Sequence, residues 1–171
     1  MPTKLAAGAA LPEITLPTVG GGHATIGGKH DRWQAIFVYR GLHCPLCKGY
    51  LAKVQEKKDD FAEQGADILF VSGDPKEKAE AFAQEVGLTL PVAYGLSVEQ
   101  MKALGLYVSI PRSDAETDRP FPEPGLFVAN PDGEAHIVEI SNAPFVRPEL
   151  DLIVRGLKAA GGGYPIRGTM A

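Results

Sequence analysis

Two apolar runs separated by an amphipathic segment constrain the fold of this chain more than any other feature. Residues 34–40 (QAIFVYR) and 66–71 (ADILFV) have the β-branched and aromatic content of buried strands. Residues 45–64 between them predict a helix, because apolar side chains recur there at helical spacing. We expect its apolar face to carry Leu46, Tyr50, Val54 and Phe61. Strand, helix and strand in this order predict a right-handed parallel crossover.

Capping motifs mark the starts of two further helices. Residues 74–77 (DPKE) place an N-cap residue, a proline at the first helical position and a capping-box glutamate in sequence, so we expect Asp74 to cap that helix. Residues 97–100 (SVEQ) predict a second capping box. A last amphipathic helix is expected around residues 150–157 and ends at Gly161.

An antiparallel hairpin is predicted where two strand-like runs surround residues 130–133 (NPDG), with Gly133 in the left-handed region. Together these elements predict an α/β fold with a mixed central sheet and helices on both faces. The length of 171 residues and the 44% hydrophobic content suffice for one core. We therefore expect a single domain over residues 1–171, with an N-terminal extension of about 1–30 and an irregular tail of about 161–171.

The charge balance excludes several classes of partner. A formal net charge of −4 and no Lys/Arg-rich run argue against nucleic-acid binding.

No stretch has the continuous apolar character of a signal peptide or a membrane span, which predicts a cytoplasmic protein that does not bind membranes. In a reducing cytoplasm, two cysteines alone indicate catalysis, redox sensing or metal binding more than a structural disulfide.

Both cysteines lie where the first strand runs into the first helix. Pro45 suits the first helical turn, so Cys44 is expected at the N-cap, where unpaired N–H groups favour a thiolate. Cys47, three residues later, returns to the same face and can form a disulfide with it. Lowering a thiol pKa by ~1.5 requires roughly 2 kcal/mol, whereas a helix terminus provides ~0.3–1 kcal/mol. His43 and Arg40 are the nearest groups that could supply the remainder, and we hypothesise that Cys44 attacks and Cys47 resolves.

Metal binding is the main alternative chemistry for this segment. His43, Cys44 and Cys47 offer three ligands, but structural zinc normally takes four, and the other histidines are scattered along the sequence. We therefore predict neither a metal nor another cofactor. A non-catalytic redox sensor or a metal-binding module remains the alternative of a different class.

Three motifs resemble one family. The Cys-Pro-Leu-Cys helix start, FVSGD after the next strand and FVANPDG in the hairpin resemble peroxiredoxin-like proteins of the alkyl hydroperoxide reductase/thiol-specific antioxidant (AhpC/TSA) family, in the thioredoxin superfamily. The resemblance extends over about residues 11–160. It implies a thioredoxin-like fold, an antioxidant oxidoreductase with a redox-active disulfide, and a cis peptide bond between Glu123 and Pro124 facing the cysteines.

The resemblance also implies partners. The substrate would be a small peroxide or disulfide, and an external thiol of the thioredoxin, glutaredoxin or glutathione type would recycle the pair. A homodimer is implied by the family alone. The protein would then be a peroxiredoxin-like enzyme, or alternatively a thiol-disulfide oxidoreductase without real peroxidase activity.

The sequence departs from the family at the positions that bind peroxide. Typical members carry Pro-x-x-x-Thr/Ser-x-x-Cys, whereas Gly41 and Phe37 stand three and seven residues before Cys44. Pro124 replaces the arginine that the family often places before the hairpin. The long polar connection of residues 110–124 would border the cysteines in such a fold, so Arg112 and Arg119 are predicted to supply the missing cation.

Overall fold

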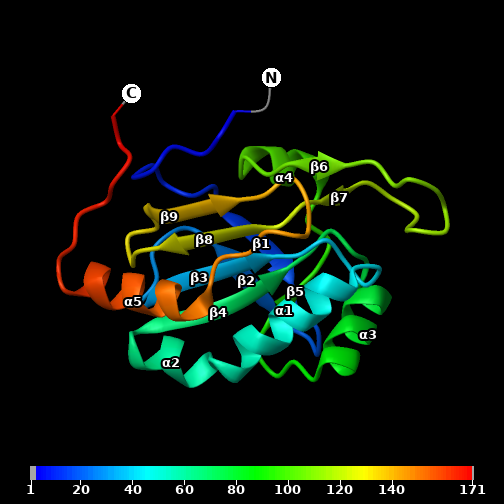
Figure 1. Cartoon of the computed structure of the whole chain (residues 1–171), viewed down its shortest axis with the longest axis horizontal. Helices are drawn as coiled ribbons and strands as arrows, with labels where there is room; N and C mark the ends of the chain where they lie inside the picture. Colours follow the sequence, from blue (N-terminus) through cyan, green and yellow to red (C-terminus); the bar gives the residue numbers. More distant parts are fainter. Residues whose placement is uncertain (1–2, 171) are drawn as a thin grey trace.

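A mixed five-stranded sheet forms the centre of the computed structural model, which describes residues 3–170 (Figure 1). The strand order is β5-β4-β3-β8-β9, in which β4 is parallel to β3 and β5, and β8 is antiparallel to β3 and β9. The central strands are β3 (Trp33–Val38), β4 (Ala66–Val71), β5 (Val92–Ala93), β8 (Gly125–Ala129) and β9 (Ala135–Ile140). Two small sheets pair β1 (Ile14–Pro17) with β2 (His23–Ile26) and β6 (Val108–Ser109) with β7 (Phe121–Pro122).

Helices cover both faces of the central sheet, as expected for the predicted fold class. The helices are α1 (Pro45–Glu56), α2 (Lys58–Glu63), α3 (Lys76–Val86), α4 (Val98–Ala103) and α5 (Leu150–Gly161). Buried side chains of α1, α2, α3 and α5 form one core with Phe37 and Phe70 of the sheet. The hairpin β1–β2 and Met101 of α4 form the other core with Ile36 and Val38. Alternate residues of β3 therefore face opposite cores, and the α/β prediction is confirmed.

The register of the sheet places the end of β3, the start of β8 and the end of β9 next to one another. Val38 at the end of β3 pairs with Gly125 at the start of β8, and Gly125 pairs with Ile140 at the end of β9. The loops that enter α1, precede β8 and follow β9 therefore leave the sheet side by side. The candidate functional site lies at these strand ends.

The prediction of the first helix is wrong in two respects. Residues 45–64 form two helices instead of one, because the chain breaks at Lys57, which ends α1 and precedes α2. The break accompanies the burial of Phe61 against Phe37, with ring centroids 5.9 Å apart. Leu46 is 49% exposed, since the inward face of α1 runs through Cys47, Leu51 and Val54 and Leu46 lies beside it.

Other local predictions are confirmed. Gly133 occupies the left-handed region (φ +85) in the β8–β9 turn, and the last helix spans the expected residues. Ser97 caps α4 in a reciprocal capping box, accepting from the Gln100 amide at 3.1 Å while the Gln100 side chain accepts from the Ser97 amide at 2.9 Å. Of residues 3–170, none belongs to a helix with the length and apolar character that spanning a membrane requires.

The capping box generates a stability prediction. Ser97→Ala leaves one helix N–H without its acceptor, so we expect the free energy of unfolding in a urea titration to fall by about 1 kcal/mol. Ser97→Ala combined with Gln100→Ala should cost less than the two single changes added, because each removes part of the same motif. Lys102→Ala, at an exposed position of the same helix, is the control and should stay within about 0.5 kcal/mol. Equal losses for Ser97→Ala and Lys102→Ala would contradict the assignment.

Candidate active site

Cys44 is the N-cap residue of α1, directly after the chain leaves β3. Its backbone is extended (φ −110, ψ 100), and Pro45 occupies the first helical turn, as predicted. The backbone N–H of Cys47 donates to Cys44 Sγ at 3.2 Å, and the Cys47 thiol is within hydrogen-bond reach of the same sulfur. Both cysteines are free thiols, with only 1% and 0% of their surfaces exposed. The structure therefore holds the reduced pair, in a geometry that needs little movement to close a disulfide.

Arg40 provides the cation next to Cys44. Its guanidinium is within hydrogen-bond reach of Cys44 Sγ, and its Nε lies 2.8 Å from Glu123 Oε1 in a largely buried ion pair. Glu123 also accepts a hydrogen bond from the Ser109 hydroxyl, and the guanidinium lies 4.8 Å from the ring centroid of Phe121. Arg40 is thus held on one side by a carboxylate and on another by an aromatic ring.

The two sulfurs differ in acidity because each has different neighbours. Hydrogen bonding from the Cys47 thiol, helped by the Cys47 amide and by Arg40 and opposed by burial, lowers the pKa of Cys44 to about 6. Hydrogen bonding to Cys44, burial and the negative charge of Cys44 raise the pKa of Cys47, while Arg147 opposes this rise. The arrangement favours the thiolate at Cys44 at neutral pH and the protonated thiol, as hydrogen-bond donor, at Cys47.

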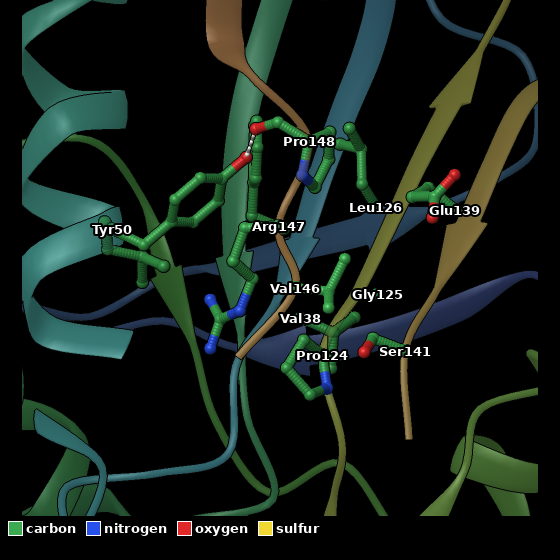
Figure 2. Close-up of a pocket in the computed structure, with 12 residues that line it drawn as sticks. Val38, Tyr50, Pro124, Gly125, Leu126, Glu139, Ser141, Val146, Arg147 and Pro148 are labelled. Carbon is green, nitrogen blue, oxygen red and sulfur yellow. Dashed lines mark hydrogen bonds between the residues drawn. The ribbon is translucent and has the colours of Figure 1, made fainter. Parts of the chain in front are cut away.

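Arg147 contacts the second sulfur. It lies in the loop between β9 and α5, and its Nη2 donates to Cys47 Sγ at 3.0 Å. Figure 2 shows its guanidinium beside the ring of Tyr50, whose centroid is 5.2 Å away. The Tyr50 hydroxyl in turn donates to Pro148 O at 2.6 Å. Sequence reasoning missed Arg147, since it lies 100 residues from Cys47 and its only local signal is a position between Pro144 and Pro148.

His43 does not supply a positive charge. Both of its ring nitrogens are buried and find no hydrogen-bond partner within residues 3–170, and its ring packs at 4.5 Å between centroids against Phe121. Burial, followed by the charge of Arg40, lowers the pKa of His43, so the neutral imidazole is favoured at pH 7. Of the two groups proposed from the sequence to stabilise the thiolate, Arg40 is the one that acts on the Cys44 sulfur.

Asp74 does not cap a helix, contrary to the sequence prediction. Helix α3 begins at Lys76, and Pro75 at its N-cap makes no side-chain hydrogen bond. The Asp74 carboxylate instead accepts from the Leu42 amide at 2.8 Å, which ties the segment before Cys44 to the loop between β4 and α3. Gly41 is required there: its φ is +145, and a Cβ would lie 2.9 Å from Asp74 Oδ1.

Arg112 and Arg119 lie on the connection between β6 and β7 and are engaged by carboxylates of that loop. Arg112 Nε is 2.7 Å from Glu116 Oε2, and Arg119 Nη2 is 2.9 Å from Asp118 Oδ2. The structure gives neither arginine a contact with a cysteine. Their assignment to the site stays a prediction, whereas Arg40 and Arg147 occupy the positions next to the sulfurs.

The prediction of a cis bond at Pro124 is wrong. No peptide bond within residues 3–170 is cis, so Glu123 and Pro124 are joined by a trans bond. The physical reason is the extended course of the chain from β7 into β8: the Glu123 amide donates to Tyr107 O at 2.8 Å while its side chain turns to Arg40. Pro124 still lines a small cleft with Tyr50 and Arg147 (Figure 2).

A wider groove continues from this cleft along the exposed face of α1. Its volume is about 750 Å³, and it shares Tyr50 and Arg147 with the cleft. Leu46 and Phe145 give it an apolar, exposed rim. The described part of the chain groups no three histidine, cysteine or acidic side chains in a metal-binding arrangement.

Comparisons with known proteins agree with this geometry. Residues 7–137 match the AhpC/TSA family. A Mycobacterium tuberculosis protein named as a candidate peroxiredoxin is 27% identical over 105 residues, which are 61% of this chain and 67% of that protein. The thiol-disulfide oxidoreductase ResA of Geobacillus thermodenitrificans is 27% identical over 106 residues, covering 61% of this chain and 60% of ResA.

Solved structures share the fold at low sequence identity. A peroxiredoxin-like protein from Aquifex aeolicus superposes with a TM-score of 0.76 at 20% identity, covering 91% of this chain and 88% of that one. AhpC of Mycobacterium bovis gives a TM-score of 0.75 at 19% identity and covers 99% of both chains. These similarities confirm the thioredoxin-like fold.

The contact between Arg40 and Cys44 generates a titration prediction. Arg40→Met removes the cation but keeps apolar packing, so we expect the pKa of Cys44 to rise from about 6 to about 7. Thiolate absorbance followed against pH in a Cys47→Ser background isolates this sulfur, since the serine hydroxyl can still donate to it.

Two controls accompany this titration. Arg112→Met combined with Arg119→Met removes two positive charges, one more than Arg40→Met, at side chains that pair with carboxylates of their own loop, and we expect the Cys44 titration to be unchanged. In Cys44→Ser, the remaining thiol of Cys47 should titrate at higher pH than Cys44 does. A larger shift from the loop arginines than from Arg40 would overturn the assignment of the cation.

Proposed function

The chain belongs to the AhpC/TSA family, and from this premise we propose that it is a thiol oxidoreductase in which Cys44 attacks a peroxide or a disulfide and Cys47 resolves the product. One observation carries the proposal: the Cys44 sulfur accepts hydrogen bonds from Cys47 and lies against Arg40, which makes it a thiolate at neutral pH. A buried thiolate beside a second thiol is suited to reversible two-electron chemistry.

With a peroxide, the Cys44 thiolate attacks one oxygen. The S–O bond forms as the O–O bond breaks, and the second oxygen leaves as an alkoxide or hydroxide that takes up a proton. Cys44 becomes a sulfenic acid, and attack by Cys47 then forms the disulfide and releases water. Arg40, next to the Cys44 sulfur, can stabilise the leaving oxygen.

With a disulfide, the same thiolate attacks one sulfur and expels the other as a thiolate. The product is a mixed disulfide on Cys44. Cys47 then attacks Cys44 Sγ, and the second half of the substrate leaves. The similarity to thiol-disulfide oxidoreductases over more than half of this chain supports this second route.

Both routes end with an oxidised Cys44–Cys47 pair, so turnover requires an external thiol. A thioredoxin-, glutaredoxin- or glutathione-like reductant is the proposed source of the two electrons. Such reductants are supplied in a reducing compartment, which favours the cytoplasm as the site of action. A homodimer is proposed from the family relationship.

Stopped-flow oxidation of the reduced protein tests the proposal. Hydrogen peroxide, an organic hydroperoxide and a small disulfide are each mixed with the protein across pH 5–9. Because the thiolate is the nucleophile, the rate of the first step should rise with pH through a half-maximal value near pH 6 and level off at about pH 8. A free thiol with a pKa of ~8.5 would still be accelerating there.

Single variants serve as controls for this experiment. Cys44→Ser should abolish the first step, whereas Cys47→Ser should allow it and stop at the sulfenic acid or the mixed disulfide. Loss of the first step in Cys47→Ser with retention in Cys44→Ser would reverse the roles of the two sulfurs. A midpoint near that of a free thiol would contradict the proposed activation.

A further inference from the structure

Each sulfur of the pair has its own arginine, and the two arginines are held differently. Arg40, beside Cys44, forms an ion pair with Glu123. Arg147, beside Cys47, forms no ion pair with any carboxylate in residues 3–170. Its guanidinium contacts the Cys47 sulfur, the Tyr50 ring and Pro144 O, which accepts from Nε at 3.2 Å. The positive charge of Arg147 is therefore not compensated by a carboxylate and points at a sulfur.

Resting on the proposed function, we propose that Arg147 is the catalytic residue of the second half-reaction: it stabilises the Cys47 thiolate that attacks Cys44. The first half-reaction does not need this charge, because Cys44 is already the thiolate and Arg40 already contacts it. The two arginines thus act on successive steps, one on the attacking sulfur and one on the resolving sulfur.

The local electrostatics change in the direction that the second step requires. In the reduced pair, the Cys47 thiol donates a hydrogen bond to the Cys44 thiolate, and the negative charge of that thiolate opposes ionisation of Cys47. Once Cys44 is bonded to a substrate sulfur, it carries no charge and is a poor acceptor. Burial still opposes ionisation of Cys47, and Arg147 remains as the contact that favours it. Cys47 therefore becomes a nucleophile only after Cys44 has reacted.

The chemistry balances without any further reactant. Cys47 loses its proton to solvent or to the leaving group, and its thiolate attacks Cys44 Sγ. The Cys44–Cys47 bond forms as the bond from Cys44 to the substrate sulfur breaks, and the substrate half leaves as a thiolate. The two electrons lost by the cysteines are those gained by the substrate disulfide.

Contacts with Tyr50 fix the position of the Arg147 guanidinium beside Cys47. The Tyr50 ring lies against the guanidinium, and the Tyr50 hydroxyl holds the next residue of the loop through Pro148 O. Figure 2 shows the two side chains between α1 and the loop that precedes α5. A planar guanidinium held on an aromatic face is pre-organised, so little conformational freedom is lost when the thiolate appears.

A disulfide with chromophoric halves separates the two half-reactions. Dithiobis(nitrobenzoate) releases one coloured thiolate when Cys44 attacks and a second when Cys47 resolves, so one stopped-flow trace reports both rates. In Arg147→Met at pH 7, we expect the first release within about twofold of the wild type. The second release should be about tenfold slower, because a rise of about two in the pKa of Cys47 is partly offset by greater intrinsic nucleophilicity.

The pH profile and two further variants exclude a merely structural effect. The second release in Arg147→Met should keep rising at pH values where the wild type has levelled, while the profile of the first release is unchanged. Arg147→Lys, which keeps the charge, should restore part of the rate. Arg155→Met removes an exposed arginine from α5 and should alter neither release.

The outcomes separate this inference from the proposed function. If the wild type does not release two equivalents, the proposed function fails. If it does, and Arg147→Met leaves the second release unchanged or slows both releases equally, the role of Arg147 is overturned while the proposed function stands.

Discussion

The hydrogen bonds from Cys47 to the Cys44 sulfur are the interaction on which the chemistry of this protein depends. Lowering the pKa of Cys44 to about 6, from ~8.5 for a free thiol, corresponds to about 3 kcal/mol in favour of the thiolate. A helix terminus provides about 0.3–1 kcal/mol, which is too little, particularly since burial acts in the opposite direction. A hydrogen bond to a charged group contributes about 1.5–3 kcal/mol, so the thiol and amide of Cys47 together with Arg40 account for the difference. Cys47 thus stabilises the Cys44 thiolate before it reacts itself as the resolving thiol.

The sheet makes this arrangement possible by bringing together segments that are distant in the chain. Cys44 follows the end of β3, where the parallel crossover enters α1. The antiparallel strands β8 and β9 bring Glu123 and Arg147 to the same end of the sheet. Each segment supplies a group of different sign or polarity to a site in which both sulfurs are buried. A buried anion of this kind is stable only where several independent elements compensate it.

Much of this fold could be predicted from the sequence, because the signals are local. The strand-helix-strand unit, the hairpin at Gly133 and the capping box at Ser97 depend on residues that are adjacent or one turn apart, and the placement of Cys44 at the helix start follows from them. The contacts that tune the site are not local. Arg147 reaches Cys47 across 100 residues, and Asp74 has the sequence of a helix cap but uses its carboxylate on another loop. Family resemblance misled at Pro124, where the course of the neighbouring strands decides the backbone.

The contact between Asp74 and the segment before Cys44 limits which substitutions the two positions 41 and 74 accept. The space at Gly41 is filled by the Asp74 carboxylate, and the backbone there has a conformation that side chains disfavour. The two positions are therefore sterically linked: a side chain at 41 fits only with a shorter residue at 74 and a different loop backbone. A side chain at 41 alone would meet the Asp74 carboxylate, and a shorter residue at 74 alone would leave the Leu42 amide without its acceptor, so either change bears on the loop that leads to Cys44.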